Sequence, residues 1–316
     1  MAMSRSAQGY SAALASAVFL STTSIFIRHL VMNFDMPPLV LACWRNIIVV
    51  ATLVPLMLLF DRGLLRVGKA HIPFLAIFGL MLAGFNGLWA ISVAQNGAAV
   101  ATVMVYCSVA YTAILGWKFM GESLGALKFT AIALCLCGCA LISGALNASA
   151  WQSNLLGVIA GLLTGLCYTA YSLMGRVTST RGISPWTTLL YIFAFAGAFL
   201  FLANLTGGWV PGSAVTPGDM FWLGASVEGW TVMILLGAIP TVGGYGFYNV
   251  SLSLLDASVA NIIVSLEPLF TAVFAFLLLG ETLTPVQLLG SALLLSGMAA
   301  IKLGDLRRPL PVPQEA

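Results

Sequence analysis

Two ionisable side chains lie deep inside long apolar stretches, where charge is costly unless it has a use. Glu267 stands about 17 Å along the helix expected at 257–279, near the middle of a ~30 Å hydrocarbon layer. Arg45 stands about 10 Å along a second such helix at 38–60. An unpaired charge at that depth costs several kcal/mol, roughly, so each group must be paired, protonated or wetted by a cavity. Glu267 is therefore a candidate for coordinating a substrate amine or for carrying a coupling proton.

Arg45 has two competing interpretations. It either forms an ion pair that merely locks helices together, or binds a carboxylate group of a substrate. The residue type alone leaves both open.

Polar and aromatic side chains recur at helical spacing on two other stretches. Asn86 and Trp89 share one helical face with Val93, and Tyr245 and Tyr248 occupy the matching positions 159 residues later. Such residues either line a shared interior or only fill space between helices. The other candidates for a central binding site are Tyr106, Tyr168, Asn249, Asn261 and Ser265. The residues expected to allow close helix approach and bending are Gly84, Gly87, Gly243, Gly244, Gly246 and Pro268.

The composition predicts that these residues sit in a membrane. Of 316 residues, 60% are apolar and only 7% charged, and the mean hydropathy is +1.02, whereas about a quarter of a soluble domain is charged. Ten apolar runs are each long enough to cross a bilayer as a helix. They are 10–32, 38–60, 72–94, 98–118, 126–145, 154–175, 185–204, 229–251, 257–279 and 285–303. We therefore expect an all-α integral membrane protein with ten transmembrane helices.

Neither a metal site nor a catalytic constellation is recognisable. Cys135, Cys137 and Cys139 alternate, so neighbours in this set lie about 200° apart on a helix and cannot converge on one ion. All six cysteines fall inside the expected spans, and we interpret these three as buried, small apolar thiols. HExxH, Walker and GxSxG motifs are absent from the sequence. The expectation is no catalytic residue, no metal, no cofactor and no enzyme activity.

The basic residues predict the orientation. Eleven of the 13 Lys and Arg fall on one side if the N-terminus is cytoplasmic. These are Arg5, Arg62, Arg66, Lys69, Lys118, Lys128, Arg176, Arg181, Lys302, Arg307 and Arg308. The positive-inside rule then places both ends, residues 1–9 and 304–316, in the cytoplasm. The net charge of +3 reflects this asymmetry and suggests no nucleic-acid partner.

The chain also matches itself. A shift of 159 residues aligns 83–142 with 242–301, and 18 of these 60 positions are identical. A weaker match at a shift of 148 pairs Arg28 with Arg176. The pattern predicts five-helix repeats at 10–145 and 154–303, joined by a linker at 146–153. Because five is odd, the second repeat is inverted in the membrane, as in many secondary transporters. The alternative is a duplication kept for stability in a channel or a membrane enzyme.

The second repeat ends with the phrase LEPLFTAVFAFLLLGE at 266–281, and the first has a decayed copy ending at Gly121-Glu122. We interpret Gly121-Glu122 and Gly280-Glu281 as helix-boundary signals rather than chemistry. The phrase and the repeat resemble the EamA-type branch of the drug/metabolite transporter superfamily over essentially the whole chain. Within that branch, the aromatic-rich centre looks most like the bacterial YddG-type aromatic amino-acid exporters.

The resemblance implies that spans 1–4 and 6–9 surround a central cavity, with spans 5 and 10 outside. It also implies alternating-access export of aromatic and other neutral or apolar amino acids, or of toxic cations, across a bacterial inner membrane. From their spacing, we expect the apolar side chain of a substrate to pack against Trp89, Tyr245 and Tyr248. We expect the amino-acid head group to bind the polar residues Asn86, Asn249, Ser265 and Glu267. The protein is expected to meet only small-molecule substrates and lipid, as a monomer or as a homodimer through spans 5 and 10. A membrane enzyme or lipid-handling protein, and a passive channel, are the alternatives.

Overall fold

The computed structural model describes residues 5–108, 110–111, 114–115, 126–142, 155–254, 263–264 and 266–306. Within these residues the regular secondary structure is helical, with no strands. The α-helices are α1 (Arg5–Phe34), α2 (Pro38–Phe60), α3 (Ile72–Asn96), α4 (Ala98–Val105), α6 (Ala126–Ile142), α8 (Leu155–Thr180), α9 (Pro185–Asn204), α10 (Val227–Leu236), α11 (Val242–Leu254), α13 (Glu267–Leu279) and α14 (Pro285–Leu306). Short 3-10 turns occupy Arg62–Leu65, Lys69–His71 and Pro217–Phe221.

Six helical segments are long and apolar enough to cross a membrane. They are Ala7–Phe34, Pro38–Phe60, Lys69–Asn96, Leu155–Gly175, Pro185–Asn204 and Val227–Tyr248. Glu267–Leu279 and Pro285–Gly297 are shorter apolar helices. Large apolar side chains such as Phe276, Leu277 and Leu278 on α13 are exposed, which suits a surface that faces lipid rather than water.

Proline and glycine set several helix ends. Pro38, Pro185 and Pro285 are the first residues of their helices, where the missing N–H would have no partner in any case. Gly97 after α3 and Gly280 after α13 have positive φ angles of 84° and 66°, which a residue without a side chain adopts at little cost.

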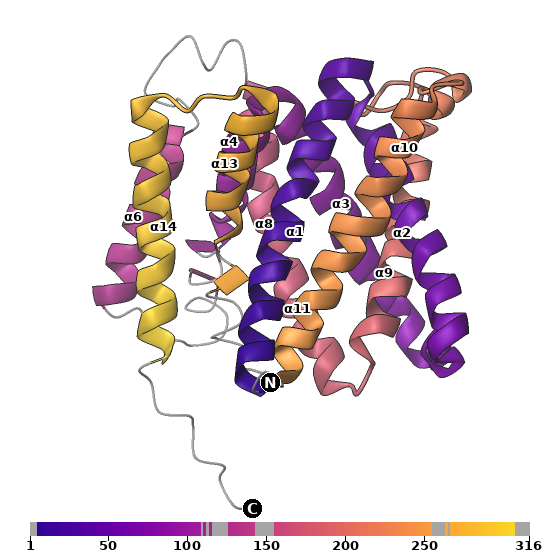
Figure 1. Cartoon of the computed structure of the whole chain (residues 1–316), viewed down its shortest axis with the longest axis horizontal. Coiled ribbons are helices and arrows are strands. Elements are labelled where there is room, and N and C mark those ends of the chain that lie inside the picture. Colours follow the sequence, from indigo (N-terminus) through magenta and orange to yellow (C-terminus); the bar gives the residue numbers. More distant parts are fainter. Residues whose placement is uncertain are drawn as a thin grey trace, which may run out of the picture.

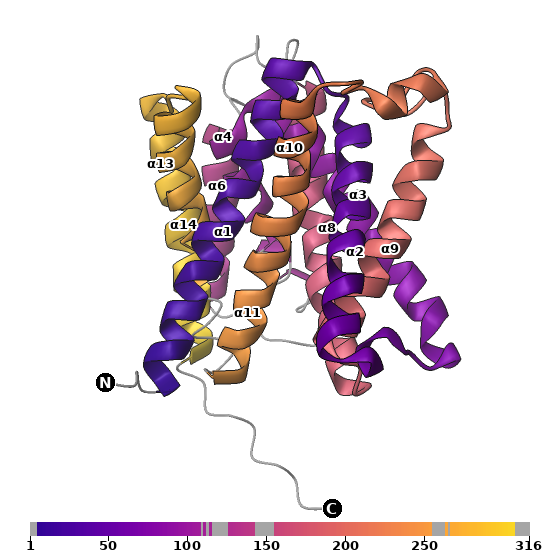
Figure 2. The ribbon, with the colours of Figure 1, turned by 45° about the vertical axis from the view of Figure 1, so that its right-hand side comes forward.

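The helices run side by side, with α3 in the middle of the packing (Figures 1 and 2). α3 contacts α1, α2, α4, α8 and α9, and α1 packs against α11 and α13. α6 and α14 pack against each other at one edge of the molecule (Figure 1). There the backbones come so close that a side-chain carbon on Gly138 would lie 2.6 Å from the carbonyl oxygen of Gly290. This edge is the peripheral position expected for the fifth and tenth spans.

Three of the expected continuous helices are interrupted. In the fourth span, α4 ends at Val105 and a turn follows at Tyr106 and Cys107. In the ninth, Leu266 is the turn residue before α13, and a shift of 159 residues places it on Cys107. Pro268 lies in the first turn of α13. In the eighth span a π-helical segment, Gly237–Thr241, contains Pro240 and separates α10 from α11.

The glycines of the sequence prediction lie at helix contacts. A side-chain carbon on Gly244 would lie 2.6 Å from Leu20, and one on Gly246 would lie 3.1 Å from Trp186. Gly84, Gly87 and Gly243 would make looser contacts, with nearest atoms at 3.3, 3.4 and 3.7 Å. The departure from α-helical geometry in this span comes before Gly243, in the π-helical segment.

The cysteines differ from one another more than expected. Cys43 is a buried free thiol, whereas Cys137 is a free thiol on the surface. The exposed Cys137 contradicts its interpretation as a buried thiol. Cys107 is disulfide-bonded. No group of three or more metal-ligating side chains forms among the described residues.

Candidate functional site

Arg45 on α2 is the centre of a buried polar network. Its guanidinium donates a hydrogen bond to the side-chain oxygen of Asn86 on α3. The Asn86 amide donates to the side-chain oxygen of Asn46 at 3.0 Å, and the Asn46 amide donates to the carbonyl of Ala42 at 2.7 Å. All three side chains are buried. The network therefore fixes the Arg45 head group between two helices.

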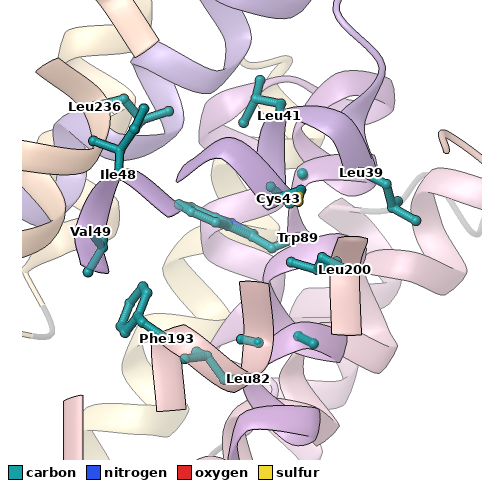
Figure 3. Close-up of a cluster of buried hydrophobic side chains, with 14 of the residues drawn as sticks. Leu39, Leu41, Cys43, Ile48, Val49, Leu82, Trp89, Phe193, Leu200 and Leu236 are labelled. Atoms are coloured by element: carbon teal, nitrogen blue, oxygen red, sulfur yellow. The ribbon is translucent and has the colours of Figure 1, made fainter. Parts of the chain in front are cut away.

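Trp89, one turn beyond Asn86, covers the same guanidinium. The Arg45 Cζ atom lies 5.3 Å from the centre of the Trp89 ring, within the range of a cation–π contact. The ring lies among buried apolar side chains of α2, α3, α9 and α10, including Leu41, Leu82 and Leu200 (Figure 3). Trp89 is thus held by packing and presents its face to the cation.

An array of aromatic rings continues from Trp89 toward α8. Trp89 stacks on Phe85 with ring centres 6.0 Å apart, and Phe85 lies 5.7 Å from Tyr168. Tyr168 in turn stacks on Tyr171 at 6.2 Å. Tyr171 shares a hydrogen bond with Tyr245 on α11. These rings join α3, α8 and α11 around one interior region.

Glu267 at the start of α13 is the second ionisable group near this region. Its carboxylate accepts a hydrogen bond of 3.0 Å from the hydroxyl of Tyr106. The contact links the turn after α4 to the first turn of α13, which are the two helix interruptions. A carboxylate in the first turn of a helix also interacts favourably with the helix dipole.

Tyr245 on α11 lies near both ionisable groups. It interacts electrostatically with both Arg45 and Glu267. The side chain of Tyr248, on the same helix, is half-buried and interacts with Tyr168 and Tyr106. We call the set Arg45, Asn86, Trp89, Tyr106, Tyr168, Tyr245, Tyr248 and Glu267 the central cluster.

The central cluster therefore includes eight of the eleven residues that the sequence singled out. Asn261 and Ser265 lie outside the described residues, as does the side chain of Asn249. Sequence reasoning did not include Asn46 or Phe85 among the site candidates, whereas Tyr171 was a candidate on the same helical face as Tyr168. Phe85 precedes Trp89 by four residues, so helical periodicity was a signal that pointed to it.

A second polar contact lies near one end of the helices, away from the central cluster. The carboxylate of Glu281 pairs with Arg28 at 3.1 Å and accepts from the backbone N–H groups of Ala98 and Ala99 at 3.0 and 3.4 Å. Arg28 also donates to carbonyl groups at the end of α3. Gly97 suits this geometry, because a side-chain carbon there would lie 2.8 Å from the Glu281 carboxylate. Gly280 is a helix-boundary residue as predicted, but Glu281 joins α1, α3, α4 and α13.

Membrane-length helices around a buried cluster of polar and aromatic side chains define a polytopic membrane protein with a site between its helices. The sequence model of the EamA-like transporter family matches this chain twice, over residues 7–144 and 155–303. The chain belongs to the EamA-like transporter family, within the drug/metabolite transporter superfamily. It is a membrane transporter and not an enzyme.

Relatives of known sequence share about a quarter of its residues. An uncharacterized transporter of Archaeoglobus fulgidus is 24% identical over 92% of this chain and 94% of its own length. The threonine/homoserine exporter RhtA of Escherichia coli strain K12 is 26% identical over 74% of this chain and 72% of its own. An uncharacterized transporter of Synechocystis is 26% identical over 67% of this chain, and the match spans 60% of its length.

A solved crystal structure has the same fold. It superposes with a TM-score of 0.57 and covers 93% of this chain and 99% of the other. The two proteins are 16% identical, so the likeness extends to the fold alone. The narrower resemblance to YddG-type exporters stays a prediction.

Proposed function

We propose that this protein is a secondary transporter that works by alternating access. Its substrates are aromatic and other apolar or neutral amino acids and related small metabolites, which it exports across a bacterial inner membrane. The main observation in support of this proposal is the Tyr106–Glu267 hydrogen bond, which joins two interrupted helices in the interior. Discontinuous helices at matching positions of two repeats are a common way to build a transporter binding site. The RhtA relative, named as a threonine/homoserine exporter, favours amino acids as the substrate class.

The repeat architecture belongs to this proposal. Ten transmembrane helices form two inverted five-helix repeats, 10–145 and 154–303, around a central cavity. The two matches of the family model, 7–144 and 155–303, support the division. The matching turns at Cys107 and Leu266 support it independently, because a shift of 159 residues superposes them as it superposes the sequences.

The proposed orientation has both termini in the cytoplasm. Three basic residues, Arg62, Arg66 and Lys69, lie in the segment between α2 and α3, at the end where α1 begins (Figure 1). Arg181 is at the same end, since its guanidinium covers the ring of Phe74 at 4.2 Å. This clustering of positive charge supports the cytoplasmic assignment of that end.

In this orientation the Glu281 contact lies at the outer end. There it ties α1 to α13 and to the junction of α3 and α4. Opening the central cluster to the outside requires these helices to separate, so the contact has to break in each transport cycle. In alternating access, the Glu281 contact forms when the outer end closes and breaks when it opens. The cytoplasmic end opens when the outer end closes, and closes when the outer end opens.

Reconstitution tests the proposal. Full-length protein in liposomes is given radiolabelled L-threonine or L-phenylalanine, with and without a pH gradient, and compared with protein-free liposomes. We expect protein-dependent movement of at least one of the two amino acids. Absence of movement for these and a panel of other amino acids refutes the proposal. Movement that ignores the pH gradient removes proton coupling and leaves facilitated diffusion.

One observation favours a second candidate, export of apolar organic cations by proton antiport. Glu267 with the rings of Tyr106, Tyr168 and Tyr245 offers a carboxylate and aromatic faces, which suit a cation. Tetraphenylphosphonium in the same liposomes distinguishes the two. Protein-dependent movement of this cation but of no amino acid would favour the second candidate.

A further inference from the structure

We propose that Arg45 binds the carboxylate group of the transported substrate, with the indole N–H of Trp89 as a second donor. The inference deepens the proposed function, on which it rests, by assigning one chemical group of the substrate to one place in the central cluster.

Arg45 is buried without a counter-charge. The residue is 3% exposed. The salt bridges among the described residues are Arg28 with Glu281 and His29 with Glu228, and neither includes Arg45. Glu267 accepts its hydrogen bond from Tyr106 instead. The interpretation of Arg45 as half of an ion pair that locks helices therefore finds no partner in the part of the chain that the structure describes.

Two neighbouring donors also have no acceptor. The Nε atom of Arg45 and the Nε1 atom of Trp89 are buried and make no hydrogen bond to any described residue. Trp89 is only 6% exposed. A buried donor without an acceptor costs about 1–3 kcal/mol, more when it is charged. The two side chains are in contact, with the Arg45 Cζ atom 5.3 Å from the centre of the Trp89 ring, so this part of the interior offers two unused donors to an anionic acceptor.

A carboxylate fits these donors best. It accepts hydrogen bonds through two oxygens and donates none, and its geometry matches the guanidinium fork. Its single negative charge balances the single positive charge of Arg45. The chain Asn86–Asn46–Ala42 already holds the guanidinium in place, so little ordering remains to be done when the anion binds.

The aromatic array places the rest of the substrate. Phe85 and Tyr168 continue the row of rings away from Arg45, and Tyr245 interacts electrostatically with both Arg45 and Glu267. A molecule with a carboxylate at Arg45 can therefore lay an apolar group along the rings and turn a positive group toward Glu267.

The test compares ligands that differ at the carboxylate or at the ammonium group. Purified full-length protein is titrated by calorimetry with L-phenylalanine, with L-phenylalanine amide and with 3-phenylpropionate, which keeps the carboxylate and lacks the ammonium group. The variants are Arg45→Gln, Arg45→Lys and Trp89→Phe, with Arg66→Gln as a matched control because Arg66 is exposed on the segment between α2 and α3. Transport of the same ligands is measured in liposomes.

Wild-type protein and Arg66→Gln should bind the acid roughly ten- to a hundredfold more tightly than the amide. Arg45→Gln should bring this ratio close to one, Arg45→Lys should retain part of it, and Trp89→Phe should lower it about fivefold. 3-Phenylpropionate should show the same dependence on Arg45. Each ratio compares two ligands on one protein, so it does not depend on yield or stability.

Two results would overturn the inference: equal binding of acid and amide by wild type, or an unchanged ratio in Arg45→Gln. Binding that depends on Arg45 without any transport would leave the carboxylate site standing and refute the proposed function. Transport that does not depend on Arg45 would support the proposed function and refute the carboxylate site. If Arg45→Gln does not fold, the ratios of Arg45→Lys and Trp89→Phe decide.

Discussion

The Glu281 contact gives the sharpest prediction, because one carboxylate holds three partners. Its oxygens pair with Arg28 and accept from the N–H groups of Ala98 and Ala99, the first two residues of α4. Glu281→Ala removes all of these interactions. Glu281→Gln keeps one acceptor oxygen and removes the charge.

The magnitude follows from burial. The Arg28 and Glu281 side chains are 22% and 18% exposed, so the ion pair is partly screened and contributes about 1 kcal/mol. Capping the first turn of α4 contributes about another 1 kcal/mol. Their sum of about 2 kcal/mol corresponds to a factor of about 30 in the local opening equilibrium. Glu281→Gln should lose about half of the free energy.

Hydrogen–deuterium exchange of the full-length protein in lipid nanodiscs measures the effect. Amides at the start of α4 should exchange about 30-fold faster in Glu281→Ala and about fivefold faster in Glu281→Gln. Glu228→Gln is the control, because this carboxylate is 73% exposed and lies 3.9 Å from the His29 ring nitrogen. Unchanged exchange in Glu281→Ala, or an equal change in Glu228→Gln, would refute the reasoning.

Three further predictions concern other parts of the molecule. Glu267→Gln should make amino-acid movement in liposomes independent of the pH gradient, and an unchanged gradient dependence would show that Glu267 does not carry the coupling proton. Gly138→Ala should lower the melting temperature, because the added carbon meets the backbone oxygen of Gly290 at 2.6 Å and no side-chain rotation relieves it; such overpacking costs roughly 1–3 kcal/mol. Hydrogen bonds from Thr216 lower the pKa of Asp219, so this loop contact is present at neutral pH and should be lost as the pH falls below about 4. The loss should be measurable as faster hydrogen exchange of the Thr216 amide. Asp219→Asn should show no such change with pH.

Hydropathy predicted where the chain is helical better than where helices stop. It places helices over 38–60, 72–94 and 185–204, and α2, α3 and α9 cover these runs. It also predicts unbroken helices at 98–118 and 257–279, whereas turns interrupt both at Cys107 and Leu266. Hydropathy measures how apolar a run is and contains no term for backbone hydrogen bonding. An interruption between apolar residues therefore leaves no trace in it.

The sequence predicted which residues form the central cluster, but it did not predict which of them contact one another. Spacing identified Asn86 and Trp89 as one face, and depth identified Arg45. The sequence did not show that all three meet, or that Asn46 completes the network. A helical face is a local property of one helix, whereas the choice of its neighbour depends on how whole helices pack.

The sequence by itself determined that the protein lies in a membrane, that its chain repeats, and that Arg45 and Glu267 are the deep charges. Only the tertiary structure decided their partners, with Glu267 meeting Tyr106 and not Arg45. It also brought Glu281 to Arg28 across 253 residues of sequence. Composition and periodicity act within single helices, and a hydrogen bond or ion pair needs its two atoms about 3 Å apart. Helix packing alone sets that distance for residues so far apart in the chain.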